Sequence, residues 1–394
     1  MKTLVRIIII FLAVVSCTQL LGRYLSFYNL LDELLLAGLL FLFIFQKKFS
    51  LKKNNLIVVF AILFYFVLNF TINFYSPSAF LLKSLYYIKS ILPFLILPYF
   101  CNKFLKQKQL KIIYYLLFSF ALFSIIEFYI LQYVSIWSFG QDWPFKLRNG
   151  LYRAMALTGH PISLGILNFM GILIGNEIFK TKKRYLLVFV VSLILTGSRI
   201  PLVFLAFYIF YCTRNFKIKL LFNKYFYFKT LYALSIPLSF VAIFFIPTYF
   251  NNVNEGSTTR LIAIENGVKV FKNPKNILFG TGIGSFGTSE SVVYNSKVYD
   301  EINFPPDYKD VILTNKATGV ETFLFMSLIE MGLIGFVLYY VLMLNLFNKK
   351  ISEFKAFLII VFILYTLVYP LYTFPFVFLI NIYFPKLLKP KTNV

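Results

Sequence analysis

Charged residues are scarce in this sequence, and their scarcity is the first indication of its class. Only 14% of the 394 residues are Asp, Glu, Lys or Arg, whereas soluble globular proteins carry about 25%. Hydrophobic residues make up 59% of the chain and aromatic residues 20%, and runs of about 20 apolar residues mark membrane helices. The composition therefore argues against an ordinary soluble protein. It predicts an all-α, polytopic integral membrane protein in which residues 1–394 form a single membrane domain.

Residues that form disulfides or bind metals are also few. The three cysteines, Cys17, Cys101 and Cys212, lie in or beside apolar segments and have no CxxC or Cys/His spacing, so neither a disulfide framework nor a zinc site is indicated. No carboxylates show the DxD or HExxH pattern that metal-dependent catalysis commonly uses. We therefore expect chemistry without a metal ion or any other cofactor.

Clusters of lysine and arginine divide the apolar segments in a regular way. About twelve spans are predicted, and a basic cluster follows each even-numbered one. Because cytoplasmic loops carry the excess of positive charge, both termini are expected in the cytoplasm. The net charge of +24 lies largely in these clusters, so nucleic acid is not expected as a partner. The predicted spans are 4–22, 30–46, 56–73, 79–100, 112–134, 161–179, 185–197, 200–213, 230–248, 319–346, 356–369 and 372–385.

The apolar run 185–211 contains an arginine, Arg199, near its middle. A charged side chain at the centre of a membrane helix costs about 2.5 to 3.5 kcal/mol on insertion scales, which argues against one continuous span. Gly197 and Pro201 instead favour a turn at 196–199, because glycine tolerates tight backbone geometry and proline suits the first turn of a helix. Arg199 is therefore predicted at the outer end of two spans.

Two long segments are predicted on the outer side, residues 135–160 and residues 249–318. The second lies between spans nine and ten, and long loops of this kind commonly carry function. Part of it, TTRLIAIENGVKVFKN, has the spacing of a short amphipathic helix. Its predicted apolar face consists of Leu261, Ile264, Val268 and Phe271.

The glycine-rich segment that follows this helix matches a nucleotide-binding pattern only formally. Gly282, Gly284 and Gly287 fit GxGxxG, but a dinucleotide site needs a preceding strand and a following helix within a βαβ unit. Here the motif is predicted to lie in a turn outside the membrane. We therefore do not expect it to bind a dinucleotide.

Several arginines are predicted on the outer face. Any one of them is also explained as an interfacial anchor, but together they favour an anionic ligand such as a diphosphate, because a guanidinium group binds phosphate oxygens bidentately. They are Arg148, Arg153, Arg199 and Arg260. His160, the only histidine, is interpreted as a general base, a phosphate contact or the start of a helix at Pro161.

Two carboxylates, Glu127 and Glu330, fall within predicted spans. A carboxylate at that depth is expected to be protonated or paired. Structural pairing is the simpler interpretation for both.

Four blocks of the sequence resemble the recurring blocks of the O-antigen ligase and O-antigen polymerase superfamily, in the same order and at similar topological positions. The resemblance covers about residues 150 to 345, whereas the first four spans are similar only in hydropathy. The blocks are RAMALTGHPISLG (153–165), LTGSR (195–199), Arg260 with NPKNILFGTGIGSFG (273–287), and ETFLFMSLIEMGLIGF (321–336).

This resemblance implies a GT-C-like membrane glycosyltransferase that needs no metal and acts on polyprenyl-diphosphate-linked oligosaccharides. It implies that Arg153, Arg199 and Arg260 hold the diphosphate, with His160 as a further candidate contact. Ligases of the superfamily have a His-Asn pair nine residues before a GxxG motif, and Glu321 and Thr322 occupy those positions here. A carboxylate can accept a proton from a sugar hydroxyl, so Glu321 is the predicted base and polymerase is favoured over ligase.

The sequence thus predicts a polymerase of O-antigen or capsule repeat units in the bacterial cytoplasmic membrane, with its active site facing the periplasm or exterior. The expected partners are undecaprenyl-diphosphate-linked oligosaccharides, the lipid bilayer and a chain-length regulator. Two alternatives stay open: a ligase that transfers finished glycan to lipid A core or another acceptor, and a flippase for the same lipid-linked oligosaccharide. Transporters often show related halves, broken helices and polar residues at mid-membrane depth, whereas here the polar residues are predicted to gather on the outer face and the long outer loop interrupts any symmetry.

Overall fold

The structure is a computed structural model. It describes residues 2–18, 28–45, 53–73, 75–133, 153–158, 160–213, 262–306, 309, 323–345, 357–358, 361, 365–366, 379 and 381–383. All regular secondary structure in these ranges is helical. The chain divides into two compact units: the first contains residues 1–49, 92–217 and 373–394, and the second contains residues 50–91 and 218–372.

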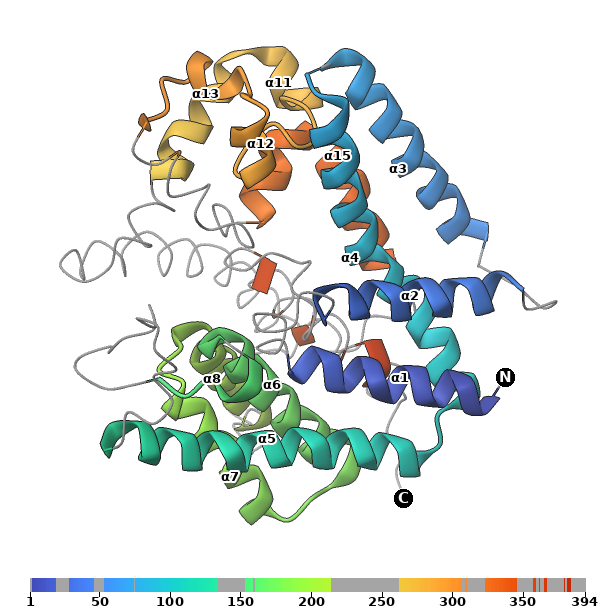
Figure 1. Ribbon diagram of the computed structural model, residues 1–394, viewed down its shortest axis with the longest axis vertical. Helices are drawn as coiled ribbons and strands as arrows, with labels where there is room; N and C mark the ends of the chain where they lie inside the picture. Colours follow the sequence, from blue (N-terminus) through green and yellow to red (C-terminus); the bar gives the residue numbers. More distant parts are fainter. Residues whose placement is uncertain are drawn as a thin grey trace, which may run out of the picture. The chain divides into compact units, whose positions relative to one another are not determined.

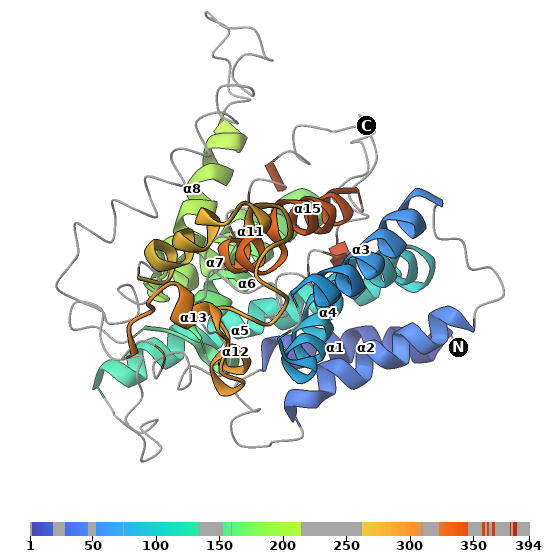
Figure 2. The ribbon, with the colours of Figure 1, turned by 90° about the horizontal axis from the view of Figure 1, so that it is seen from above.

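The first unit is a bundle built around one buried helix, α6. Almost every residue of α6 is buried, and this helix contacts α5, α7 and α8. Gly171 lets the ring of Phe189 pack directly against the α6 backbone, where a Cβ would overlap it. In Figure 1 and Figure 2, α5 runs beside α6 and α7. The helices of this unit are α1 (Lys2–Cys17), α2 (Tyr28–Ile44), the last part of α4 (Pro77–Phe104), α5 (Gln107–Tyr133), α6 (Pro161–Ile174), its π-helical continuation Gly175–Phe179, α7 (Lys183–Leu195) and α8 (Arg199–Thr213).

The second unit combines apolar helices with a small helical subdomain. Its long helices are α3 (Lys53–Ile72), the first part of α4, and α15 (Phe323–Asn345). The subdomain spans residues 262–306 and holds a 3-10 helix (Val268–Lys272), α11 (Pro274–Phe279), α12 (Ser289–Val293) and α13 (Val298–Glu301). Figure 1 shows α11, α12 and α13 gathered near one end of α3 and α15.

The subdomain has a hydrophobic core that it shares with α15. Phe286, Tyr299 and Phe304 form mutual aromatic contacts in this core, and Ile329 of α15 completes it. Burial raises the pKa of the Tyr299 hydroxyl, so this group stays protonated. It accepts a hydrogen bond from the backbone N–H of Gly287 at 2.9 Å and lies 2.6 Å from the Ser291 hydroxyl.

Four described helices are long and apolar enough to cross a membrane: 77–104, 107–130, 161–179 and 323–340. Shorter apolar helical stretches occur at 33–44, 59–72 and 200–209. Within the residues that the structure describes, the prediction of a helical protein with apolar helices of membrane-spanning length is confirmed. The count of twelve spans and the GT-C-like arrangement stay predictions, because segment 230–248 and most of 356–369 and 372–385 lie outside the described residues.

The predicted turn is confirmed as a break between two helices, while their crossing of the membrane stays a prediction. Helix α7 ends at Leu195 and α8 begins at Arg199. Between them, Gly197 has a φ of 56°, a left-handed conformation that glycine adopts without the steric cost paid by other residues. The backbone conformation of the turn therefore places Arg199 at the first position of α8.

The apolar face predicted for the outer-loop helix is confirmed at Phe271, which packs against the hydrophobic core, and is wrong at Val268, while Leu261 lies outside the described residues. Residues 262–267 are α-helical, but the chain tightens to a 3-10 helix at Val268, and the Val268 side chain is 50% exposed. The buried side contains Ala263 and Gly267 instead. A Cβ at Gly267 would lie 2.5 Å from Cδ1 of Ile329, so the helix turns its smallest residues to α15 because they permit the closest approach.

Candidate functional site

Arg153 is the best described of the predicted outer arginines, and its side chain holds the turn that carries Arg199. Its Nε donates to the carbonyl of Thr196 at 2.8 Å, and its Nη2 donates to the hydroxyl of Ser198 at 2.8 Å. The Arg153 side chain also passes Gly197 at van der Waals distance from the position of a Cβ. Two of the segments that the resemblance assigns to diphosphate binding, those of Arg153 and Arg199, are therefore adjacent in the first unit.

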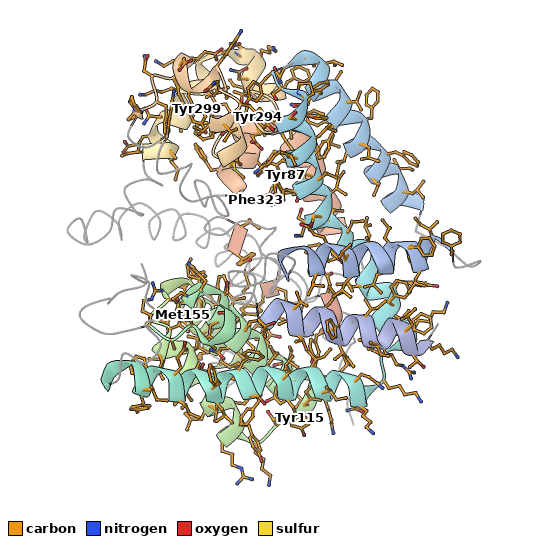
Figure 3. The ribbon with its side chains drawn as sticks, in the orientation of Figure 1. Tyr87, Tyr115, Met155, Tyr294, Tyr299 and Phe323 are labelled. Atoms are coloured by element: carbon orange, nitrogen blue, oxygen red, sulfur yellow. The ribbon has the colours of Figure 1, made fainter. Side chains whose placement is uncertain are left out.

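Glu127 fixes the segment that begins at Arg153. Its carboxylate accepts hydrogen bonds from the backbone N–H groups of Met155 at 3.1 Å and Ala156 at 2.6 Å. On the other side, the backbone N–H of Ala154 donates to the carbonyl of Leu195 at 3.1 Å. The predicted pairing of Glu127 is confirmed, and its partners are backbone amides. Figure 3 labels Met155 in this segment.

His160 begins α6, which was one of its three predicted roles. It is the N-cap residue, with φ −150° and ψ 130°, and its Nδ1 accepts a hydrogen bond from the backbone N–H of Ile162 at 3.2 Å. Acceptance at Nδ1 requires that the proton of the neutral ring sits on Nε2. Capping leaves the roles of base and phosphate contact as hypotheses.

We expect His160→Ala to lower the stability of the first unit by about 1 kcal/mol, the usual effect of removing an N-cap. His160→Asn should retain most of that stability, because asparagine is a favourable N-cap. Thermal unfolding of the purified protein checks both values. Equal stability of the alanine variant and the wild type would show that the cap contributes nothing. Loss of activity in the asparagine variant without loss of stability would reveal a chemical role for the ring.

The other predicted site residues are less fully placed. Arg199 is located only through its backbone at the start of α8. Arg148, Arg260 and Glu321 lie outside the described residues. Their roles in binding diphosphate and in accepting a proton stay predictions.

Sequence reasoning missed a second polar site, at a break in α15. The helix is interrupted at Gly332, which has φ 60° and ψ −175°. A break exposes carbonyl groups that have no helical partner, and inside a membrane such groups must be satisfied within the protein. The carbonyls of Ile329, Glu330 and Met331 are the ones that accept hydrogen bonds from outside the helix.

The glycine-rich segment 280–287 supplies part of this capping. The backbone N–H of Thr281 donates to the carbonyl of Ile329 at 2.9 Å, and that of Gly282 donates to the carbonyl of Glu330 at 3.1 Å. The close approach has no room for side chains, since a Cβ at Gly280 would lie 2.5 Å from the backbone nitrogen of Gly332. The GxGxxG segment is thus a structural cap for a broken helix.

Side chains of α3 supply the remaining hydrogen bonds at the break in α15. The Tyr65 hydroxyl donates to the carbonyl of Met331 and, at 3.2 Å, to that of Phe279. Asn69 donates from Nδ2 to the carbonyl of Phe279 at 2.7 Å, and its Oδ1 accepts from the backbone N–H of Ile283 at 3.0 Å. These polar side chains lie on the buried face of α3, so they join the loop to this helix.

The carboxylate of Glu330 lies at the centre of this arrangement and is fully buried. It accepts a hydrogen bond from the Tyr87 hydroxyl at 2.6 Å and from the backbone N–H groups of Gly284 at 3.1 Å and Phe286 at 3.5 Å. Figure 3 shows Tyr87 close to Phe323, where α4 meets α15; the two ring centroids are 5.5 Å apart. The predicted pairing of Glu330 is confirmed.

A buried lysine accompanies this carboxylate. Lys83 of α4 is 1% exposed, and it is near enough to Glu330 to interact electrostatically with it. Its Nζ lies 3.5 Å from Sδ of Met326 and 5.6 Å from the centroid of the Tyr87 ring. The sequence held two signals for this site, Lys83 inside the predicted span 79–100 and Glu330 inside the predicted span 319–346, because ionisable residues within spans are functional or paired by default.

Neither site shows a cluster that fits a metal. Among the residues that the structure describes, no three His, Cys, Asp or Glu side chains are grouped so that they could hold an ion.

Comparison of the chain with protein-family models, with curated proteins and with solved structures finds no match. The function is therefore inferred from the residues and their geometry.

Proposed function

We propose that this chain is a membrane glycosyltransferase that polymerises lipid-linked oligosaccharide repeat units on the outer face of the bacterial cytoplasmic membrane. One observation carries the proposal: Arg153 binds the turn at whose end Arg199 begins α8. This contact keeps two arginine-bearing segments together at one end of a bundle of apolar helices. A lipid diphosphate, which is anionic and lies at the membrane interface, suits such a pair.

The proposed reaction joins the growing glycan to a hydroxyl of a new repeat unit. The hydroxyl oxygen attacks the anomeric carbon, the bond from that carbon to the diphosphate breaks, and the diphosphate leaves with the electron pair. The hydroxyl proton passes to the carboxylate of Glu321. Arg153, Arg199 and Arg260 stabilise the charge that develops on the diphosphate, and no nucleotide or metal is required because the donor bond is already activated.

A ligase that transfers finished glycan to a terminal acceptor is the nearest alternative, and it would use the same arginines. A flippase for the lipid-linked oligosaccharide is an alternative of another class. The break in α15 beside Glu330 and Lys83 favours this second alternative, because transporters place broken helices and ionisable residues at their substrate sites. The same break is also explained by the capping contacts that close it, so polymerase is retained as the conclusion.

The test is the length of the product made by purified protein in lipid vesicles with its own lipid-linked repeat unit and no other acceptor. Wild type should give a ladder on a gel. Arg199→Ala should reduce the rate about 100- to 1,000-fold, the usual effect of removing one stabilising donor from a transition state. Glu321→Gln should also abolish the ladder if its carboxylate accepts the proton.

The matched control is Arg184→Ala, which removes an exposed arginine from the opposite end of α7 and should leave the ladder unchanged. A wild type that forms product only when a distinct acceptor is added would be a ligase. A wild type that moves the lipid-linked substrate across the bilayer without joining it would be a transporter. Full activity of Arg199→Ala would refute the proposed role of the turn.

A further inference from the structure

Helix α11 and the 3-10 turn before it carry an unusual exposed surface. Ile277 is 42% exposed and Leu278 is 45% exposed, although both are large aliphatic residues. The lysines of the same stretch, Lys269, Lys272 and Lys275, are exposed as well. Within residues 267–280 there is no acidic residue. The surface therefore combines aliphatic side chains with positive charge, which is the pattern of segments that lie in a membrane interface.

The hydrogen bonds of α11 fix its level relative to α3. Lys275, near the start of α11, donates from Nζ to the carbonyl of Ile72, the last residue of α3, at 3.1 Å. Phe279, the last residue of α11, accepts from Asn69 at 2.7 Å, about 4.5 Å further into α3 at a rise of 1.5 Å per residue. Ile277 and Leu278 therefore lie beside the final turn of α3.

The exposed surface of α3 indicates where α11 lies relative to the bilayer. The apolar stretch of this helix, residues 59–72, ends with the helix at Ile72, so the last turn of α3 is the limit of its apolar surface. Apolar side chains on one face of α3 are widely exposed, including Phe60, Phe64 and Val67 at 61% to 69%, as expected for a face that contacts lipid. The end of α3, and with it α11, falls at the boundary between acyl chains and headgroups.

We infer that α11 is an interfacial anchor, with Ile277 and Leu278 inserted among the acyl chains and Lys272 and Lys275 bound to the phosphates of anionic phospholipids. Long lysine side chains suit this position because the stem lies along apolar surface while the ammonium reaches the headgroups. Each such lysine adds about 1 kcal/mol of attraction to an anionic surface. The anchor leads directly into segment 280–287, so the bilayer surface sets the depth of the cap on α15.

Fluorescence quenching by lipid tests the inference in the full-length chain. The two native tryptophans, Trp137 and Trp143, are replaced by phenylalanine, and Leu278→Trp introduces one reporter. The protein is reconstituted in vesicles of phosphatidylcholine and phosphatidylglycerol whose acyl chains carry bromine near the headgroup. We expect the reporter to lose most of its emission relative to vesicles of unbrominated lipid.

The control reporter is Glu301→Trp, at an exposed position of α13 in the same subdomain, which should keep its emission. Adding Lys272→Glu to the Leu278→Trp protein should weaken quenching in vesicles with phosphatidylglycerol and leave it unchanged in pure phosphatidylcholine; Lys275 is kept because it also holds α11 to α3. Ile277→Trp repeats the measurement if the first reporter disturbs folding. Equal emission in brominated and unbrominated lipid at both positions 277 and 278 would overturn the anchor. If quenching is the same with and without phosphatidylglycerol, and is not changed by the lysine substitution, the proposed binding to anionic phospholipids would be overturned. Neither result depends on the glycosyltransferase proposal.

Discussion

Replacement of Glu330 by alanine is expected to lower the free energy of unfolding of the second unit by about 3 to 5 kcal/mol, the effect of removing one partner from a buried charged network. The carboxylate accepts three hydrogen bonds, from Tyr87, Gly284 and Phe286. The alanine variant leaves these donors without an acceptor in a buried site, and each unsatisfied donor costs about 1 to 3 kcal/mol. It also removes the carboxyl group that interacts electrostatically with Lys83.

Denaturant unfolding of the protein in a fixed lipid or detergent environment measures this change. Glu330→Gln should have a smaller effect, because its side-chain carbonyl still accepts a hydrogen bond although the charge is lost. The matched control is Glu301→Ala, which removes an exposed glutamate from α13 and should not alter the midpoint. If Glu330→Ala unfolds at the wild-type midpoint, the carboxylate does not hold segment 280–287 to α15.

A double-mutant cycle separates the charge interaction from the hydrogen bonds. Lys83→Met keeps an unbranched side chain of similar length and removes the ammonium group. If Lys83 and Glu330 stabilise one another, the combined change with Glu330→Gln is smaller than the sum of the two single changes, since each single variant leaves one charge buried alone. Additive effects would mean that the two residues act independently.

The sequence was sufficient to predict the helices and the turn between α7 and α8. Apolar runs of membrane length determine where a helix forms, and that information is local. Gly197 and Pro201 also act locally, through their own backbone geometry, and α8 begins at Arg199, one residue before the predicted start at residue 200. Features of this kind need no knowledge of distant residues.

The break in α15 could not be predicted in the same way, because its cause lies far along the chain. Residues 323–340 form one apolar run, and Gly332 alone does not distinguish a broken helix from a continuous one. The deciding contacts come from Gly280, Thr281 and Tyr65. Only the folded chain brings these residues to the Gly332 backbone.

The candidate sites show the same division between local and distant information. Placement of Arg153 and the Arg199 turn at one end of the bundle followed from the order of the spans, but the hydrogen bonds that join them did not. The pairing of Glu330 was predicted from its burial alone. Its partners were not, because the contacts of the glycine segment with α3, α4 and α15 join residues that are far apart along the chain.

These contacts make the glycine segment and the first part of α15 one structural piece. Glu321, the predicted base, precedes the first residue of α15 by two positions. Asn69 of α3 holds this glycine segment at a fixed depth. The inferred insertion of α11 in the bilayer interface would set the same depth. A change at Glu330 or at the break is therefore expected to affect activity through the position of α15 as well as through stability.

Replacement of Gly332 by alanine provides the sharpest test of the break, because the two possible structures predict opposite signs. At φ 60° and ψ −175°, a conformation that is essentially restricted to glycine, another residue is strained by about 1 to 3 kcal/mol. An added Cβ would also lie 2.6 Å from the carbonyl carbon of Leu278, so backbone must shift. We expect a total loss of stability above about 4 kcal/mol, which is exceptional for one methyl group.

The control is Gly38→Ala in α2, where an added Cβ has no atom within 4 Å. This variant should be as stable as wild type or more stable by up to about 1 kcal/mol, because alanine favours a helix more than glycine does. If α15 were continuous, Gly332→Ala would behave in the same way and stabilise the protein. Thermal unfolding of the two variants side by side therefore decides between a broken and a continuous α15, since only the broken helix makes position 332 intolerant of a methyl group that position 38 accepts.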